Sequence, residues 1–219
     1  MIVDVVMLAC SKTPELIRMT QHAIDTLHSS EKLYKFNVIL LESHAQLHMY
    51  RGAMCVKPAC EFNYNKFMNI GIDASHHDWV VMTNNDVEFK YGWFSAIVKA
   101  SQDLPEVKSF CSFARQHVQA EMSNPYYVRY GVGGFLCGWC ITVKREIFKK
   151  FRLNEEVSFW CSDNVYQDQL IEHGIKHALV RDSYVEHLGG VTLFTMPQDK
   201  IHEFTAGQAE IYAAINTRK

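Results

Sequence analysis

The stretch Trp79-Val-Val-Met-Thr-Asn-Asn-Asp-Val-Glu-Phe89 passes from an apolar run directly into amide and carboxylate side chains. This pattern predicts a buried strand over 79–83 that ends in a polar cluster. Asn-Asn-Asp also favours a simple turn, because these side chains hydrogen-bond locally. Oxygen ligands at a strand end suit Mg²⁺ or Mn²⁺, which proteins hold with one or two carboxylates plus substrate phosphates. Asp86 is the predicted metal ligand.

Two apolar runs upstream end in polar residues in the same way. The first covers 2–9, and the second covers 36–41 and ends at Glu42. Continuous apolar runs are typical of parallel strands that are covered on both faces. The carboxyl ends of three such strands are expected to meet at one crevice, where ligands bind in open α/β sheets.

Helices are predicted between these strands. Thr13 can cap the first helix, and Pro14 suits its first turn. A second helix is predicted over 63–74, where apolar residues repeat at helical spacing. The alternation predicts an α/β fold with a mostly parallel central sheet and helices on both faces.

The second half of the chain has a less regular pattern. We predict a single domain over 1–219, in which a first half covers 1–100 and a second half covers 101–219. The elements expected in the second half are a loop over 114–134, a strand over 136–143, a short basic helix over 145–151, a helix capped by Ser162 or Asp163 and closed by Gly174, a strand over 177–185, and a C-terminal helix over 200–215. The C-terminal helix carries a seam of Ile201, Phe204, Gln208, Ile211 and Ile215, and should dock on the core.

Composition excludes several classes of protein. The net charge of -2 gives no overall positive field for nucleic acid or an anionic membrane, so any polyanion must meet a local patch. The longest apolar runs are too short to span a bilayer, and the first residues do not resemble a secretion signal, so we expect a cytoplasmic protein. Seven cysteines at irregular spacing favour free thiols. Cys137 and Cys140 fall in a predicted strand, which disfavours a redox or zinc motif.

The order of these motifs resembles family 2-like glycosyltransferases of the GT-A fold along nearly the whole chain. The resemblance rests on the opening strand and turn, the helix over 63–72, the Asn84-Asn-Asp86 cluster in place of Asp-x-Asp, and the small-residue strand over 133–148. It implies a nucleotide-diphosphate sugar as donor, with UDP favoured, and Mn²⁺ or Mg²⁺ as cofactor. It also implies that 1–100 is the nucleotide-sugar-binding half and 101–219 the acceptor and catalytic half. The implied donor-binding residues are Ala9, Ser11, Glu42, Asn65, Lys66, Asn84, Asn85, Gly133 and Gly134.

Two later segments match the same family in the expected order. Phe159-Trp-Cys-Ser-Asp-Asn164 resembles the segment that supplies the catalytic base, which would be Asp163. The stretch 184–190 resembles the late strand whose histidine completes the metal site, so His187 is implied as the second metal ligand. Taken singly, the aspartate reads as a helix cap and the histidine as a core residue, and their shared order with Asp86 favours the functional roles. Asn84 and Ser162 depart from the family pattern, since each replaces a carboxylate, and Asn84 is the weaker metal ligand.

The acceptor is less well defined by the sequence. Tyrosines and arginines over 115–131, together with a basic cluster of Lys144, Arg145, Lys149, Lys150 and Arg152, are what an enzyme needs to hold a nucleotide turned out of a duplex. The compact chain is also similar in size to small phage-encoded enzymes that glycosylate hydroxymethylated pyrimidines in DNA. We therefore rank DNA slightly above a surface polysaccharide or a lipid-linked acceptor.

Two other functions fit parts of the sequence. A sugar-nucleotide-binding module without catalysis agrees with the two departures from the family pattern. A nucleotidyltransferase ranks last, because the turn over 9–14 lacks the glycine-rich phosphate loop that such enzymes use.

Overall fold

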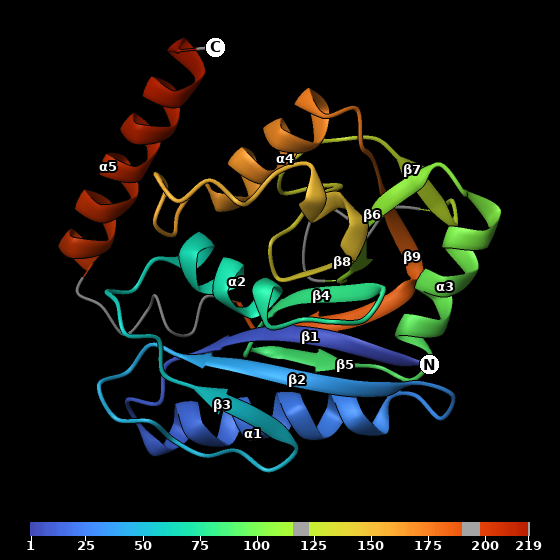
Figure 1. Cartoon of the computed structure of the whole chain (residues 1–219), viewed down its shortest axis with the longest axis horizontal. Helices are drawn as coiled ribbons and strands as arrows, with labels where there is room; N and C mark the ends of the chain where they lie inside the picture. Colours follow the sequence, from blue (N-terminus) through green and yellow to red (C-terminus); the bar gives the residue numbers. More distant parts are fainter. Residues whose placement is uncertain (116–122, 190–197, 219) are drawn as a thin grey trace.

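The structure is a computed structural model and describes residues 1–115, 123–189 and 198–218 (Figure 1). Parts of the predicted loop over 114–134 and of the segment over 184–190 lie outside the described residues. The elements in chain order are β1 (Ile2–Ala9), α1 (Pro14–Ser29), β2 (Lys35–Glu42), β3 (Ala53–Val56), α2 (Tyr64–Asp73), β4 (Trp79–Asn84), β5 (Val87–Phe89), α3 (Trp93–Asp103), β6 (Val107–Phe113), β7 (Tyr126–Val128), β8 (Cys140–Lys144), the 3-10 helix η2 (Arg145–Lys149), α4 (Ser162–Glu172), β9 (Lys176–His187) and α5 (Gln198–Thr217).

The strands form one sheet in the order β3-β2-β1-β4-β8-β6-β9-β5, with β7 added beside β9. The strands from β3 to β4 are all parallel, as the apolar runs predict. Strand β8 extends the sheet beyond β4 and runs antiparallel to both β4 and β6. Register places Ala9 opposite Glu42, and Leu8 opposite Asn84. The carboxyl ends of β1, β2 and β4 therefore lie side by side.

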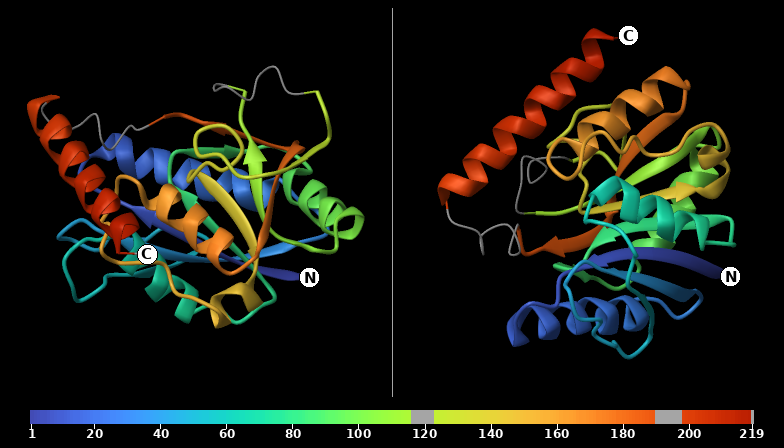
Figure 2. Two further views of the ribbon diagram at one scale, coloured as in Figure 1. Left: turned by 90° about the horizontal axis from the view of Figure 1, so that it is seen from above. Right: turned by 60° about the vertical axis from the view of Figure 1, so that its left-hand side comes forward.

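Helices cover both faces of the sheet, as predicted. Val3, Val5 and Met7 of β1 pack into a core cluster with α1 and α3, whereas Val6 and Leu8 pack into a second cluster with α2 and α4. Successive side chains of a strand point to opposite faces, so this division places the two helix layers on the two sides. Figures 1 and 2 show α1 on one side of the strands and α2 and α4 on the other.

Three predictions for the second half need correction. The strand predicted over 136–143 begins only at Cys140, because the chain turns over 137–139 before it pairs with β4. The predicted basic helix is a single 3-10 segment. The residue that caps α4 is Cys161 in a left-handed conformation, with φ of 66°, so Ser162 and Asp163 lie in the first helical turn. Gly174 ends the helix with φ of 64°, as predicted.

The cysteines of the Cys137-Gly-Trp-Cys140 segment are buried thiols, not members of disulfides. Burial raises the pKa of the Cys140 thiol to about 12, which disfavours the reactive thiolate. No helix among the described residues has the length and apolarity to cross a membrane.

The C-terminal helix α5 docks on the loop before α4 and on α4 itself (Figure 2). Ile215 packs with Val157 and Val165 in a small cluster that is separate from the two main core clusters. Tyr212 donates a hydrogen bond of 2.9 Å to the carboxylate of Asp168 on α4. The predicted seam of α5 thus contacts the segment around 157–168.

Helix α2 lies unusually close to the sheet at Gly71. A β-carbon at this position would come within 2.3 Å of the Val6 side chain. The absence of a side chain therefore sets the distance between α2 and β1.

We predict that Gly71→Ala destabilises the fold by roughly 1–3 kcal/mol, because the added methyl group overpacks the interface of α2 with β1. Gly207→Ala in α5 is the matched control, since a β-carbon there meets no atom within 4 Å. That control should stabilise the chain by about 0.5–1 kcal/mol, because glycine weakens a helix. Urea unfolding should move the two midpoints in opposite directions, and equal shifts would contradict the packing argument.

Candidate active site

A cavity of about 470 Å³ opens at the carboxyl ends of β1, β2 and β4. This is the crevice that the strand ends predict. Its walls come from seven separate segments of the chain. The lining residues are Leu8, Ala9, Cys10, Lys12, Ser43, Phe62, Tyr64, Asn84, Asn85, Asp86, Phe159, Trp160, His187 and Phe204.

Asp86 and His187 lie next to each other in the lining of this cavity. The Nε2 atom of His187 is 3.3 Å from Oδ1 of Asp86, and both side chains are largely buried. The short strand β5 makes this contact, because Val87 pairs with His187 across the ladder. The backbone N–H of Leu188 also donates to the carbonyl of Asp86 at 2.9 Å. Trp139 stacks on the imidazole with ring centroids 5.0 Å apart, which holds the ring plane.

The pair fits a divalent cation that takes few ligands from the protein. One carboxylate and one imidazole face the cavity together, and the amide of Asn84 lines the same wall. Among the described residues, no group of three or more His, Cys, Asp or Glu side chains converges on one point. Such a site leaves several coordination positions for substrate phosphates and water, which is the usual arrangement for Mg²⁺.

Asp163 lies in the first turn of α4, three residues after Trp160 of the cavity lining. It is not itself a lining residue of the cavity. A β-carbon built on Gly138 would sit 3.7 Å from that of Asp163, which is an ordinary van der Waals distance, so Gly138 lies directly beside Asp163. The Tyr64 hydroxyl donates to the carbonyl of Gly138 at 3.4 Å. These contacts connect the predicted base to the cavity wall.

Charge and burial also connect the two carboxylates. Burial raises the pKa of Asp163, although the backbone N–H of Asn164 opposes this by donating to its carboxylate at 3.0 Å. The pKa of Tyr64 is raised by burial first, and then by the charges of Asp163 and Asp86. Tyr64 and Asp86 also line the same cavity, and the hydroxyl of Tyr64 contacts Gly138, which lies beside Asp163.

Three of the nine predicted donor-binding residues line the cavity, and the other six do not. Ala9, Asn84 and Asn85 line the cavity. Ser11 and Glu42 lie behind its wall, and Glu42 has no exposed surface. The Glu42 carboxylate accepts hydrogen bonds from the backbone N–H and the hydroxyl of Ser11, and from the backbone N–H of His44 at 2.8 Å. In this arrangement Glu42 holds the turn after β1 against the end of β2.

The other predicted donor contacts lie outside the cavity wall. Asn65 is buried, and its amide donates to the carbonyl of Asn154 at 2.6 Å, so it holds the loop before α4. Lys66, Gly133 and Gly134 are absent from the lining residues. The glycines form a turn in which the N–H of Gly134 donates to the carbonyl of Gly131 at 3.2 Å.

The loop over 154–160 is held from two sides. From α2, the N–H of Tyr64 donates to the carbonyl of Ser158 at 2.6 Å. From α5, Gln208 presents Oε1 to three donors: the N–H of Ser158 at 2.7 Å, its hydroxyl at 3.0 Å, and the N–H of Phe159 at 3.3 Å. Gln208 was visible in the sequence as the one polar residue of the α5 seam, and this position was the available signal for its role.

The tyrosines predicted to face the acceptor make other contacts. Tyr126 donates to Asp103 at 2.7 Å, and Tyr130 donates to the carbonyl of Ile175 at 2.8 Å. Strand β7, which contains Tyr126, pairs with β9. No described residue of 115–131 lines the cavity.

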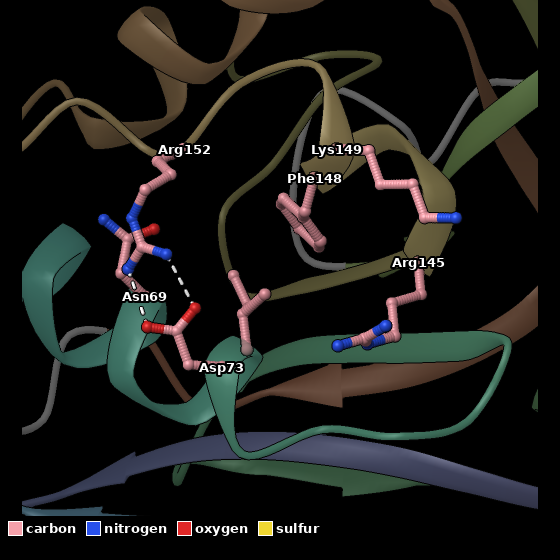
Figure 3. A pocket seen from close by; sticks show the side chains of 7 residues that line it. Asn69, Asp73, Arg145, Phe148, Lys149 and Arg152 are labelled. Atoms are coloured by element: carbon pink, nitrogen blue, oxygen red, sulfur yellow. Dashed lines mark hydrogen bonds and ion pairs between the residues drawn. The ribbon is translucent and has the colours of Figure 1, made fainter.

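The basic cluster defined above lies at the other end of α2. Figure 3 shows Arg145, Lys149 and Arg152 between η2 and α2. They line a recess with a volume of about 90 Å³. Arg152 donates to both carboxylate oxygens of Asp73, the last residue of α2, at 2.6 and 2.9 Å. Tyr64 begins the same helix and lines the main cavity, so about 13 Å of helix separates the two sites.

No protein-family model matches this sequence, and no curated protein matches it. Among solved structures, residues 1–349 of TarS from S. aureus superpose with a TM-score of 0.62. The match covers 98% of this chain and 72% of that chain at 8% identity, and TarS is a family 2-like glycosyltransferase. The fold is GT-A-like. At this identity the likeness extends to the arrangement of helices and strands and not to individual site residues.

We predict that Gln208→Ala lowers the free energy of unfolding by about 1–3 kcal/mol, because buried donors lose their acceptor. Gln208→Glu keeps an acceptor oxygen at the same place and should restore most of this loss. Glu210→Ala, on the exposed side of α5, is the control for helix composition. Thermal unfolding of the three variants is the measurement. Equal losses of stability for Gln208→Ala and Glu210→Ala would contradict the role of Gln208 in holding the loop over 154–160.

Proposed function

We propose that this chain is an inverting, metal-assisted glycosyltransferase that moves a sugar from a nucleotide-diphosphate donor to an acceptor hydroxyl. One observation carries the proposal: Asp86 lies 3.3 Å from His187 in a cavity that Tyr64 also lines. The hydroxyl of Tyr64 donates to the carbonyl of Gly138, and Gly138 lies beside Asp163. A cation-holding pair and a buried carboxylate thus approach one cavity from different elements. The GT-A-like fold supports the same reaction class without proving it.

The donor diphosphate is proposed to lie across the carboxyl ends of β1 and β4. Asp86 and His187 would hold Mn²⁺ or Mg²⁺, which when bound offsets the charge that develops on the departing diphosphate. Lys12 lines the same end of the cavity and adds a positive charge there. The turn that carries Lys12 is fixed by the buried bonds of Glu42 to Ser11. UDP remains the favoured nucleotide of the donor.

Asp163 is the proposed general base. As the acceptor oxygen forms a bond to the anomeric carbon, the bond from that carbon to the phosphate oxygen breaks, and the hydroxyl proton passes to the Asp163 carboxylate. The raised pKa that burial gives this carboxylate makes it a better proton acceptor. A single displacement of this kind inverts the anomeric configuration.

Hydroxymethylated pyrimidine in DNA stays a predicted acceptor from sequence, with a surface polysaccharide or a lipid-linked saccharide as the alternatives. The DNA prediction depends on tyrosines and on a basic cluster close to the site. The tyrosines of 115–131 that the structure describes lie outside the cavity wall, and the basic cluster lies at the far end of α2. These positions favour an acceptor other than DNA.

We predict that Asp163→Asn lowers the rate of sugar transfer by roughly 10²- to 10⁴-fold, the usual worth of a general base. Donor binding should persist, because the base acts on the acceptor proton. In the wild type, activity should fall as pH drops through a pKa above 3.8, since the base must be ionised and burial raises its pKa. Turnover assays across pH test both effects, with Glu172→Gln at the other end of α4 as the control. Near-normal turnover by Asp163→Asn would remove it from the role.

We predict that Asp86→Ala weakens the binding of Mn²⁺ and of UDP together, because the cation bridges protein and diphosphate. Calorimetric titration of Mn²⁺ with and without UDP measures this coupling independently of turnover. Asp73→Ala removes an exposed carboxylate at the far end of α2 and should leave both affinities unchanged. Full activity of Asp86→Ala in the presence of a chelator would refute the metal site.

A further inference from the structure

Five aromatic side chains form one wall of the cavity, and the proposed reaction gives them no role. They are Phe62, Tyr64, Phe159, Trp160 and Phe204. Three of these rings surround that of Phe159, with centroid distances of 6.2 Å to Phe62, 6.0 Å to Tyr64 and 6.1 Å to Phe204. We call this set the aromatic wall.

The aromatic wall lies on the side of the cavity nearest to the proposed base. Phe159 and Trp160 precede Asp163 by only four and three residues, and the hydroxyl of Tyr64 donates to the carbonyl of Gly138, which lies beside Asp163. The strand ends that carry Ala9 and Asn84 form the other side, where the donor is placed. An acceptor whose hydroxyl reaches Asp163 therefore lies against the aromatic rings.

The wall exposes apolar surface that a monomeric protein normally covers. Phe62 is 44% exposed and Trp160 is 46% exposed, and both line a cavity that also has polar residues such as Asn85 in its lining. Contiguous apolar surface at the rim of a pocket marks a binding site. The exposed rings point to a ligand with an apolar face and a polar edge.

The charge around the wall disfavours nucleic acid as that ligand. Among the described residues that line the cavity, Lys12 is the one lysine or arginine, and it lies at the donor end. Binding of DNA depends on neutralising several phosphates with lysine or arginine. A saccharide needs no such cations, because the C–H face of its ring packs on aromatic rings while its hydroxyl groups reach polar atoms.

We propose that the aromatic wall is the acceptor subsite and that it binds a neutral saccharide, stacked on Trp160 and enclosed by Phe204 of α5. This inference rests on the proposed function, since it places the acceptor beside Asp163. Gln208 supports the subsite by holding the backbone of Ser158 and Phe159 in place. The C-terminal helix thereby contributes directly to acceptor specificity.

Tryptophan fluorescence gives a binding test that needs no turnover. The chain has four tryptophans, and Trp79, Trp93 and Trp139 are at most 8% exposed. Acrylamide quenching of the native protein therefore reports chiefly on Trp160. We predict that neutral disaccharides or trisaccharides, titrated in the presence of UDP and Mn²⁺, protect Trp160 from the quencher.

Variants test whether the protection arises at the aromatic wall. Phe204→Ala should weaken the binding of the protecting saccharide about tenfold, which corresponds to about 1.4 kcal/mol. Tyr91→Ala removes an equally large ring that is 74% exposed before α3, and should leave the affinity unchanged. Binding of UDP should be the same in both variants, because the donor end contains neither ring.

Each other outcome would overturn the saccharide proposal. Protection by a duplex carrying 5-hydroxymethylcytosine but by no saccharide would assign the wall to nucleic acid. Protection by a polyprenyl phosphate alone would assign it to a lipid, and protection by none of the three probes would remove the subsite. A failure of the proposed function is separate, because it would appear as no binding of UDP or UDP-sugars by thermal shift.

Discussion

The pairing of β5 with β9 is the interaction on which the candidate site depends. Three residues of β5 are enough to place Val87 opposite His187, and this register brings Asp86 beside the imidazole. The strand ends of β1, β2 and β4 would form a crevice without this pairing. The crevice would then lack the two proposed metal ligands, Asp86 and His187, side by side. Hydrogen bonds of the backbone thus fix the spacing of two side chains that are about a hundred residues apart in the sequence.

A second constraint acts on the segment that carries Phe159, Trp160 and Asp163. This segment has no strand partner in the sheet, so its shape depends on hydrogen bonds from the helices on either side. Helix α2 supplies the backbone N–H of Tyr64, and α5 supplies the side-chain oxygen Oε1 of Gln208. Loops with functional residues are usually positioned by a rigid scaffold. Here the scaffold is completed by the last helix of the chain.

The sequence predicted the parts of the fold that follow from hydrophobic periodicity. Strands β1 and β2 and helices α1 and α2 are apolar over their full length or on one face. The predicted bounds of β1, β2 and α2 agree with the structure to within one residue, and α1 begins at Pro14 as predicted. The segment over 137–139 was predicted as strand, because its residues are mostly apolar like those of the strand that follows, and an apolar run alone does not distinguish a buried turn from a strand. Strand β5 is too short to give a periodic signal, and it exists through its pairing with β9. The positions of Glu42 and Asn65 depend on partners elsewhere in the chain, so their contacts could not be read from local sequence.

Cys161 adopts a left-handed backbone conformation directly before α4, at a cost of roughly 1–2 kcal/mol for a residue with a side chain. Its thiol packs against the cluster of Val157, Val165 and Ile215, so the docking of α5 offsets this strain. The position of the first turn of α4 is therefore thermodynamically linked to the seating of the C-terminal helix. By reciprocity, a ligand that stabilises the docked position of α5 would also stabilise the position of the Asp163 carboxylate, two residues after Cys161. Occupancy of one side of the cavity would then preorganise the chemistry on the other.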